Sequence, residues 1–389
     1  MIRMKIKDIC DLQNGRAFKP SDWGTAGLPI IRIQNLNDER APFNYYGGKY
    51  NLAQEVDNGD LLFSWSGTPG TSFGAFLWNR GKGVLNQHIF KVIPKVEVDK
   101  TYLMYALNGN ISTIVSKAHG GVGLQHITKK ELDEIEIQMV SISRQKKIVE
   151  ILEKISLLIF LRKQQLAKLD EVVKARFVEM FGEPVSNPYK FEVRSLQNML
   201  DDGIITYHLD GNHGSDYPRN EEFVQTGIPY ISANCIVNGN IDFSLAKHLT
   251  KERAKKLRKG IAQNGDVLFA HNATVGPVSI LHTDEEKVIL GTSLTAYRCN
   301  KKVVLPPYLK CYMQSDGFVR QYSKDMKQTT RNQVPITIQR KYLFMIPPLS
   351  LQNEFAAFVE RVDQQKQTVQ QSLEKLELMK KALMQEYFG

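Results

Sequence analysis

The residues of this chain that are best suited to chemistry lie in polar, glycine-containing loops, and none of them has the spacing of a catalytic site. The eight histidines are scattered without metal-ligand spacing. Residues 67–74 lack the Gly-Lys-Ser/Thr of a phosphate-binding loop. The Gly-Asp pairs at 59–60 and 265–266 are not followed by the further carboxylates and lysine of a metal-dependent nuclease. Each of these aspartates is therefore predicted to be a turn residue that precedes a strand.

A methyl-transfer motif is also incomplete. Pro-Pro-Tyr at 306–308 resembles the end of the motif with which amino-methyltransferases hold a flipped base. The preceding residue is Leu305, which accepts no hydrogen bond from an amino group. The sequence therefore predicts no catalysis and no metal site in this chain.

The polar loops instead have the composition of a nucleic-acid interface. Arg, Asn, Gln, His and Thr are the side chains that contact base edges or phosphates. Arg331 is the strongest candidate because it is the only arginine in its amide- and hydroxyl-rich loop, with Arg16 as its candidate counterpart. For any single residue, an ordinary hydrophilic surface loop is the alternative. The full candidate set is Asn14, Arg16, Trp65, Thr68, His119, Gln125, His126, His208, His213, His271, Asn272, Lys327, Gln328, Thr329, Thr330, Arg331 and Asn332.

These loops occupy matching places because the chain repeats itself. Gly-Ile-Pro-Tyr-Ile-Ser at 227–232 corresponds to Gly-Leu-Pro-Ile-Ile-Arg at 27–32, and Asn-Gly-Asp-Val-Leu-Phe-Ala at 264–270 corresponds to Asn-Gly-Asp-Leu-Leu-Phe-Ser at 58–64. The offset grows from 200 residues near the start to 207 at the end of each copy. A period this long indicates a duplicated domain, not a solenoid.

Each copy ends in a long helix with a heptad pattern of apolar residues, at 143–182 and 350–389. Both helices begin with Ser and a nearby Gln, and both finish on Phe-Gly. About 40 residues at 1.5 Å per residue give a length of roughly 60 Å. We expect the two helices to pair antiparallel and to hold the domains at opposite ends, related by a pseudo-two-fold axis. The alternative is two unrelated surface helices that pack only on their own domains.

The predicted fold class is α/β (α+β), with two similar mixed domains joined by the two helices. We divide the chain into a domain at 1–142, a central long helix at 143–182, a second domain at 183–349 and a C-terminal long helix at 350–389. Runs of alternating or β-branched apolar residues predict strands in both domains, and one short helix is expected in each. The strands are expected at 28–33, 60–64, 88–93, 228–232 and 266–270, and the short helices at 101–108 and 307–315.

Composition favours a polyanionic partner. The net charge is +10 and the cationic block at 251–259 is a candidate phosphate contact, or alternatively a solvated helix face. The four cysteines have no CxxC spacing, which excludes a zinc knuckle and indicates free thiols in a reducing compartment. With no apolar leader and no run long enough to span a bilayer, a cytoplasmic protein is expected.

In this order of elements, the chain resembles the specificity subunits of type I restriction–modification systems. The resemblance rests on Asn-Gly-Asp-φ-Leu-Phe (φ is apolar) at 58–63 and 264–269, Ile-Pro-Pro-Leu-Ser-Leu-Gln at 346–352, and the Phe-Gly helix ends. Gln-Thr-Thr-Arg-Asn-Gln with the following Ile-Thr, at 328–337, adds to it. The first copy departs from the pattern, because 140–145 lacks the Pro-Pro and 119–125 replaces the Thr-rich loop.

The resemblance implies a subunit without catalysis of its own that binds a bipartite, asymmetric site on double-stranded DNA. It also implies two methyltransferase subunits, which dock largely on the helices and use S-adenosylmethionine to methylate adenine, and possible restriction subunits joined through them. Three alternatives stay open: a related bipartite-site methyltransferase or nuclease system, a self-contained DNA enzyme, and a coiled-coil adaptor that binds no DNA.

Overall fold

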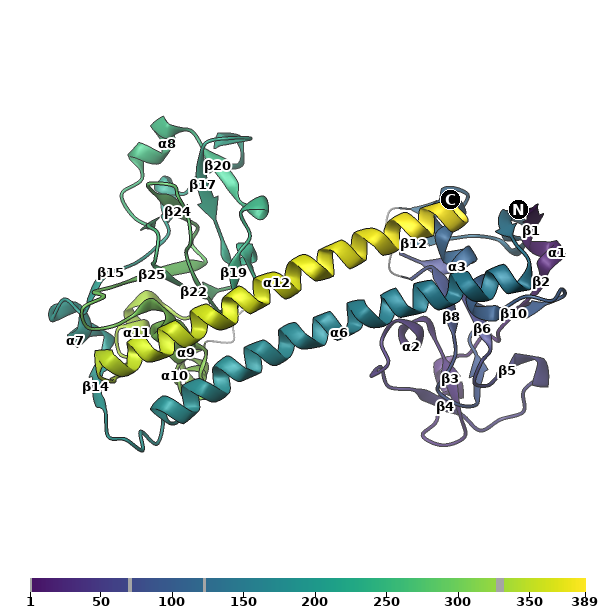
Figure 1. The fold of residues 1–389 in the computed structure, drawn as a ribbon, viewed down its shortest axis with the longest axis horizontal. Coiled ribbons are helices and arrows are strands. Elements are labelled where there is room, and N and C mark those ends of the chain that lie inside the picture. Colours follow the sequence, from purple (N-terminus) through teal and green to yellow (C-terminus); the bar gives the residue numbers. More distant parts are fainter. Residues whose placement is uncertain (1, 69–71, 122–123, 327–331) are drawn as a thin grey trace. The chain divides into compact units, whose positions relative to one another are not determined.

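The structure is a computed structural model that describes residues 2–68, 72–121, 124–326 and 332–389. Contacts divide the chain into two compact units. Unit 1 contains Met1–Lys163 and Gln370–Gly389, and unit 2 contains Gln164–Val369. Each unit therefore combines one globular domain with part of each long helix, so the contacts cut across the four segments expected from the sequence (Figure 1).

The described residues of the unit 1 domain form small sheets and short helices. Its central sheet is antiparallel, in the order β2 (Cys10–Asn14), β10 (Ile89–Pro94), β6 (Leu61–Ser64) and β8 (Gly74–Leu77). A second sheet has the order β4 (Asn44–Tyr46), β3 (Leu28–Ile31), β9 (Gly83–Leu85) and β5 (Glu55–Val56). A three-stranded sheet has the order β11 (His119–Gly121), β12 (Leu124–His126) and β7 (Ser66–Gly67). A two-stranded sheet pairs β1 (Ile2–Lys5) with β13 (Glu136–Met139). The helices are α1 (Ile6–Ile9), α2 (Ile33–Asn37), α3 (Lys100–Gly109), α4 (Ile111–Ser116) and α5 (Lys129–Asp133).

The domain of unit 2 has the same plan with additions. Its central sheet has the order β15 (Ile205–Asp210), β25 (Leu294–Cys299), β22 (Val267–Asn272) and β23 (Thr274–Ile280). The second sheet has the order β16 (Phe223–Val224), β20 (Lys247–Leu249), β17 (Ile228–Ile231), β24 (Val288–Leu290) and β21 (Ile261–Ala262). The two remaining pairs are β14 (Glu192–Ser195) with β26 (Leu343–Ile346), and the hairpin β18 (Ile236–Val237) and β19 (Asn240–Ile241). The helices are α7 (Leu196–Asp201), α8 (Lys251–Lys256), α9 (Pro306–Gln314), α10 (Asp316–Asp325) and α11 (Ile336–Gln339).

The duplication is confirmed strand by strand. In both central sheets the first strand pairs with the last, which pairs with the strand that follows the Gly-Asp turn. In both second sheets the strand that contains Pro29 or Pro229 runs parallel to the strand that leads into the last central strand. The turn aspartates also behave as predicted, since Asp266 accepts a hydrogen bond from the backbone of Gln263 and Asp60 accepts one from the backbone of Asp57.

The two long helices are α6 (Ile142–Phe181) and α12 (Leu349–Phe388), each one residue earlier at both ends than the sequence predicts. Gly182 follows α6 with φ of 72°, the left-handed conformation that commonly ends a helix. The predicted heptad residues are buried or half-buried along both helices, including Leu152, Ile155, Val362 and Leu373. The buried face that these positions form is called the seam below, and at Ile148, Leu152 and Phe355 it packs in the domain cores.

Within each unit the two helical segments run antiparallel. In unit 1, Arg144 lies over the ring of Tyr387, while Lys163 pairs with Glu377 at 2.9 Å. In unit 2, Arg176 pairs with Glu354 at 2.7 Å, while Lys366 pairs with Asp170 at 2.7 Å. In both units, later residues of α6 meet earlier residues of α12, as predicted.

Each domain core is completed by the end of a long helix. Phe388 of α12 packs against Tyr102 in unit 1, with ring centroids 5.3 Å apart. Phe181 of α6 packs against Tyr308 in unit 2 in the same way, at 4.8 Å. The shared Phe-Gly ends of the two copies are thus core residues.

The glutamine near the start of each long helix has a structural role too. Gln145 is buried and its side-chain oxygen accepts a hydrogen bond from the backbone of Asp99, the residue that caps α3. Gln352 is also buried and accepts the equivalent bond from Leu305 before α9. These amides join each long helix to the short helix of its domain. Among the described residues, no helix is both long and apolar enough to cross a membrane.

Candidate nucleic-acid interface

In unit 1, most of the candidate residues gather at one end of the central sheet. Asn14 ends β2 and Trp65 follows β6, and the indole N–H of Trp65 donates to the side-chain oxygen of Asn14 at 3.2 Å. The Trp65 ring is stacked on Phe90 of β10, with centroids 5.6 Å apart. The aromatic ring is thus held half-buried at the sheet end.

The small sheet of β7, β12 and β11 extends this surface. Gln125 pairs with Gly67 and His126 pairs with Ser66, and Thr68 directly follows β7. The side-chain oxygen of Gln125 is buried and has no hydrogen-bond partner within the described part of the chain. His126 is exposed on the same strand. Amide and imidazole groups therefore line this edge.

His119 lies opposite His126 on β11 but is already engaged. Its imidazole pairs with the carboxylate of Glu131 in α5. Hydrogen bonds from Thr128 and then from His119 lower the pKa of Glu131 to about 2, so this carboxylate is ionised at neutral pH. A negative charge beside His119 makes this position less favourable for a phosphate.

Arg16 has a bracing role in the same region. Its guanidinium lies 4.7 Å from the ring centroid of Tyr46 and donates to the hydroxyl of Tyr46 at 2.7 Å and to the carbonyl of Lys49 at 2.9 Å. The chain passes very close to Asn86 at Gly15, where a Cβ would lie 2.2 Å from the Asn86 carbonyl oxygen. Both hydrogen bonds come from Nη1, and the contact of Arg16 with DNA stays a prediction.

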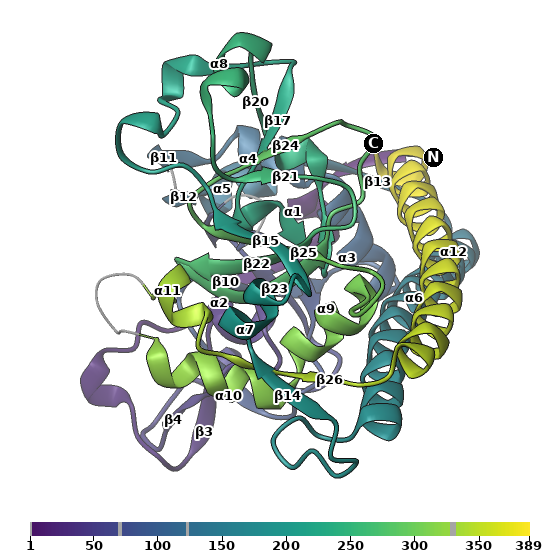
Figure 2. The ribbon, with the colours of Figure 1, turned by 90° about the vertical axis from the view of Figure 1, so that its left-hand side faces the viewer.

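In unit 2, the equivalent end of the central sheet also carries candidate residues. Figure 2 shows this sheet of β15, β25, β22 and β23. His213 is exposed and its imidazole Nε2 lies 2.7 Å from a carboxylate oxygen of Asp210, the last residue of β15. Asn272 ends β22 and forms an isolated bridge with Gln333. The neighbouring Asn332 is exposed, and its carbonyl accepts a hydrogen bond from Ala273 at 2.9 Å. These residues form a polar rim around the start of the 332–334 segment.

His208 and His271 do not belong to the exposed surface predicted for them. Their side chains are 3% and 1% exposed, respectively. His208 Nε2 lies 3.2 Å from the side-chain oxygen of Gln339, and His271 Nδ1 lies 3.0 Å from the carbonyl of Val334. Side chains buried this deeply do not reach a DNA duplex, so the structure corrects their role from contact to positioning.

This buried network fixes the C-terminal side of the loop that precedes α11. Gln339 donates to the Val334 carbonyl at 3.1 Å and accepts a hydrogen bond from the hydroxyl of Tyr297 at 2.6 Å. Val334 in turn donates its backbone N–H to the carbonyl of His271 at 2.8 Å. Residues 332–334 are therefore held against the domain at a fixed point. The candidates Lys327, Gln328, Thr329, Thr330 and Arg331 lie outside the described residues.

Sequence reasoning missed the turn between β9 and β10. Gln87 is exposed and its amide nitrogen lies 3.2 Å from the ring nitrogen Nε2 of His88. His88 lies 5.4 Å from Trp65, measured between ring centroids, which places it in the same surface. The internal repeat could have identified this turn. It precedes the last strand of the central sheet in the first copy, as residues 291–293 do in the second copy.

Positive charge is concentrated in α8 and the residues after it. Lys251, Lys255 and Lys256 are exposed, as a phosphate contact requires. Arg253 is instead held by Glu222 at 2.5 Å and by the carbonyl of Asp216 at 3.0 Å. The cationic block is therefore partly surface and partly structural.

The described residues offer no cluster of three or more His, Cys, Asp or Glu side chains that would hold a metal ion. The cysteines are free, and burial raises the pKa of Cys10 and of Cys299 to about 12, so their thiols are poor nucleophiles. The arrangement is suited to binding through amides, imidazoles, an indole and cations.

Comparison with protein families gives two matched regions. Residues 3–171 and 210–378 each match the family described as the type I restriction modification DNA specificity domain. The chain is 20% identical over 387 residues to the specificity subunit of the type I restriction enzyme EcoBI from Escherichia coli, which covers 93% of this chain and 79% of that protein. It is 21% identical over 336 residues to the MjaVIII specificity subunit from Methanocaldococcus jannaschii, which covers 85% of this chain and 78% of that protein.

Two solved structures have the same fold. The S subunit of a type I restriction–modification system from M. genitalium is similar with a TM-score of 0.54 and 16% identity, over 100% of this chain and 96% of that chain. A chain from a type I R-M system, described for its complex assembly and conformational transition, gives a TM-score of 0.59 and 14% identity, over 100% of this chain and 97% of that chain.

Proposed function

Because this chain belongs to the family of type I restriction–modification DNA specificity domains, we propose that it reads a bipartite, asymmetric DNA site, one half with each of its domains. It is a specificity subunit, a DNA-recognition component without catalysis of its own. The observation that carries the two-reader proposal is that the same domain occurs twice, with the candidate residues at the same end of each central sheet.

The side chains at the two sheet ends differ, as two readers of different half-sites require. The first set contains Trp65, Gln125 and His126, while the second contains His213 and Asn332. Amide and imidazole groups distinguish base pairs by their donor and acceptor pattern in the major groove. An unread spacer between the half-sites would then be set by the long helices.

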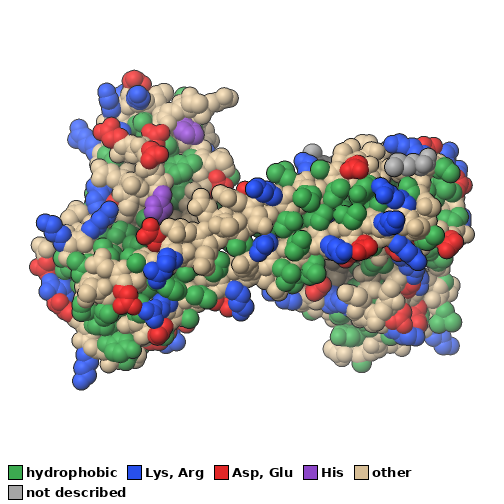
Figure 3. Space-filling model, viewed as in Figure 1, with side chains coloured by type: hydrophobic (Ala, Val, Ile, Leu, Met, Phe, Trp, Pro, Cys, Tyr) green, Lys and Arg blue, Asp and Glu red, His purple; other side chains and the backbone are tan. Residues whose placement is uncertain are grey.

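An exposed apolar strip supports docking of protein partners on the helices of unit 1. Leu157 and Phe160 of α6 are 56% and 55% exposed, and Leu378 and Met379 of α12 are 67% and 52% exposed. Figure 3 shows hydrophobic side chains gathered on the helices. Large exposed apolar side chains gathered on a pair of helices mark an interaction site. We assign it to a methyltransferase subunit, one of two in the complex, which would bring the S-adenosylmethionine and the methyl-transfer chemistry. Restriction subunits would join through the methyltransferases.

The remaining alternatives differ in which features of the chain they explain. A related bipartite-site methyltransferase or nuclease system would use the same two readers with other catalytic partners. A coiled-coil adaptor would account for α6 and α12, but it gives no reason for a polar rim at the same end of both sheets. A self-contained DNA enzyme would show methyl transfer by the purified chain alone.

Exchange of one domain tests the proposal. Residues 183–349 are replaced by the equivalent segment of a relative, and the chain is expressed with its cognate partners. Sequencing of methylated sites should show a change in one half of the recognised sequence only. The other half should persist because residues 1–142 are unchanged, and the spacer should persist because α6 and α12 are retained.

The reciprocal exchange of residues 1–142 is the matched control and should alter the opposite half-site. Loss of all methylation would call for a check of complex assembly by gel filtration. If either exchange altered both half-sites together in an assembled complex, the two-reader proposal would be wrong.

A further inference from the structure

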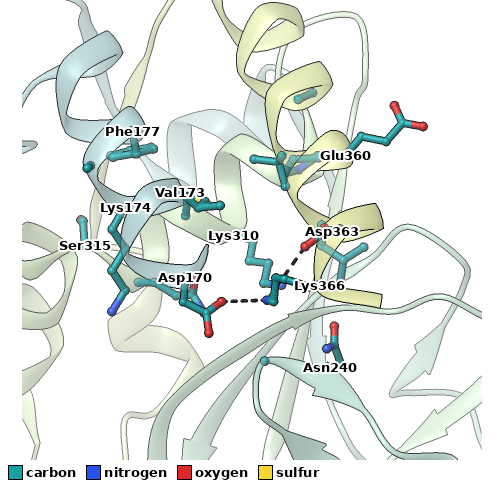
Figure 4. Close-up of a pocket in the computed structure, with 18 of the residues that line it drawn as sticks. Asp170, Val173, Lys174, Phe177, Asn240, Lys310, Ser315, Glu360, Asp363 and Lys366 are labelled. Atoms are coloured by element: carbon teal, nitrogen blue, oxygen red, sulfur yellow. Dashed lines mark hydrogen bonds and ion pairs between the residues drawn. The ribbon is translucent and has the colours of Figure 1, made fainter. Parts of the chain in front are cut away.

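A groove with a volume of about 1530 Å³ lies in unit 2, where the two long helices pass α9 and the β18–β19 hairpin (Figure 4). Cys311 and Lys310 of α9 line it together with Val173 of α6 and Asp363 of α12. Asn240 of β19 lines the opposite side. The groove is therefore bounded by both long helices and by the domain.

The internal repeat identifies the residue that occupies the equivalent place in unit 1. The hydroxyl of Tyr102 in α3 donates to the carbonyl of Gln138 at 2.9 Å, and the hydroxyl of Tyr308 in α9 donates to that of Met345 at 2.8 Å. These matching bonds align the two short helices. Three residues later in each helix, Tyr105 of unit 1 corresponds to Cys311 of unit 2.

In unit 1 the tyrosine fills this place. Tyr105 is 7% exposed, and its hydroxyl donates to a carboxylate oxygen of Glu153 at 2.6 Å and lies 3.4 Å from the hydroxyl of Ser156. The ammonium of Lys380 lies 5.9 Å from the ring centroid. The phenol thus bridges the short helix to both long helices.

Unit 2 has polar counterparts of the long-helix residues but lacks the aromatic side chain. The offset of 207 between the long helices makes Glu360 the counterpart of Glu153 and Asp363 the counterpart of Ser156, and both side chains line the groove. A thiol replaces the phenol at this position of α9, and Cys311 lines the groove together with both carboxylates. The second copy therefore holds a vacant aromatic position with acceptors still in place.

The excess negative charge of the groove indicates what kind of ligand it binds. Six carboxylate side chains line it against three lysines, and one of these, Lys366, is already paired with Asp170 at 2.7 Å. The six are Asp170, Glu179, Glu183, Asp316, Glu360 and Asp363. An excess of carboxylates repels DNA, nucleotides and phosphate, and it favours a basic ligand.

The size of the groove indicates a polypeptide. Pockets for small molecules commonly enclose about 300–1000 Å³, which is less than the 1530 Å³ found here. A groove between helices is typical of sites that take a partner helix or loop with one or two anchoring side chains. An aromatic anchor fits such a site best, since large rigid rings contribute most at interfaces.

We propose that this groove binds a basic segment of one methyltransferase subunit, whose aromatic side chain takes the place above Cys311 that Tyr105 fills in unit 1. The inference rests on the proposed function, because it needs two methyltransferase subunits on one chain. Unit 1 has its aromatic position filled by Tyr105 and offers the exposed apolar strip instead. The two methyltransferase subunits are therefore bound by chemically different surfaces and with unequal affinity.

The test uses the full chain and its cognate methyltransferase subunit, titrated and followed by native mass spectrometry. Cys311→Tyr supplies the first-copy residue and fills the groove, while Cys311→Ser is the matched control that leaves it open. A second variant, Glu360→Gln with Asp363→Ser, removes two carboxylates from exposed positions and leaves the core unchanged. The melting temperature of each variant shows whether it folds.

Cys311→Tyr and the double variant should each weaken the binding of one methyltransferase subunit by about tenfold or more and leave the other bound as before. Cys311→Ser should match the wild type. Wild-type affinities for both subunits in both groove variants would overturn the inference, as would lost DNA binding with unchanged stoichiometry. If Cys311→Tyr does not fold, the double variant decides alone. A wild-type chain that binds no methyltransferase would instead refute the proposed function.

Discussion

His208 and His271 act as neutral hydrogen-bonding groups in the interior of unit 2. Burial is the main cause that lowers the pKa of His208 to about 4, and burial also lowers the pKa of His271. Each imidazole donates to an oxygen, His208 from Nε2 to Gln339 and His271 from Nδ1 to Val334. Within the described residues the other ring nitrogen of each histidine is buried without a partner, so a second proton there would be an unpaired buried charge. The position of residues 332–334 therefore depends on the protonation state of two buried side chains.

The stability of unit 2 should accordingly fall in mild acid. His208 has a folded pKa of about 4, below its ordinary value of 6.5, so its contribution is complete above pH 6.5 and is lost as the pH falls toward 4. One proton corresponds to at most about 1.4 kcal/mol of unfolding free energy per pH unit. Urea unfolding of the wild type and of His208→Gln between pH 7 and pH 4.5 should show a flatter pH dependence in the variant. His126→Gln, an exposed control in unit 1, should follow the wild type; a His208→Gln curve parallel to the wild type would contradict the assignment.

The burial of these histidines explains why the sequence located the polar loops but not the inward side chains. Strict alternation would place Ile205 and His208 on opposite faces of β15, yet both are buried. The pairing of β15 with β25 shifts register between Ile205 and Tyr207, and β22 shifts register between Phe269 and His271. A bulge reverses the facing of every residue after it, and composition gives no sign of where one occurs.

At the scale of elements, long periodic segments were predicted far better than short ones. The heptad pattern located α6 and α12 to within one residue at each end, because forty residues give many repeats of one signal. The strands β7 and β12 have two and three residues and were not predicted. Strands this short exist only because they pair with each other, so their formation depends on tertiary contacts that a local pattern does not contain.

Two leucines on α12 separate the structural face of the helix from the binding face. Leu373 is 6% exposed in the seam of unit 1, and Leu378 is 67% exposed on the apolar strip. Leu373→Lys should lower the unfolding free energy by about 2–5 kcal/mol, because it removes buried apolar contacts and buries an unpaired charge. Leu378→Lys should change stability by less than about 0.5 kcal/mol but weaken methyltransferase binding.

Thermal unfolding and a pull-down with the methyltransferase subunit distinguish the two effects. Equal destabilisation by both substitutions would argue against the seam. Normal partner binding by Leu378→Lys would remove the apolar strip from the proposed interface.

At the scale of the whole molecule, the internal duplication was the main basis for predicting the domain plan. Two copies of one pattern allowed the plan of the second domain to be checked against the first, and the matching sheets show that the framework was inferred correctly. The division into units was not foreseen, because the sequence segments end where the helices begin. Phe388 and Tyr102 are far apart in the chain but in contact, and such contacts place the end of α12 in unit 1.

The closure of each domain by the end of a long helix has a consequence for synthesis on the ribosome. Unit 2 is one continuous stretch, Gln164–Val369, whereas the core of unit 1 needs Phe388. The N-terminal domain is therefore made first but completed last, and it must wait, partly folded, while the whole of unit 2 emerges. Protease digestion of ribosome-bound chains of increasing length should show a protected unit 2 before a protected unit 1; early full protection of residues 2–163 would contradict this order. A type I system would then gain its first complete reader from the second half of the message.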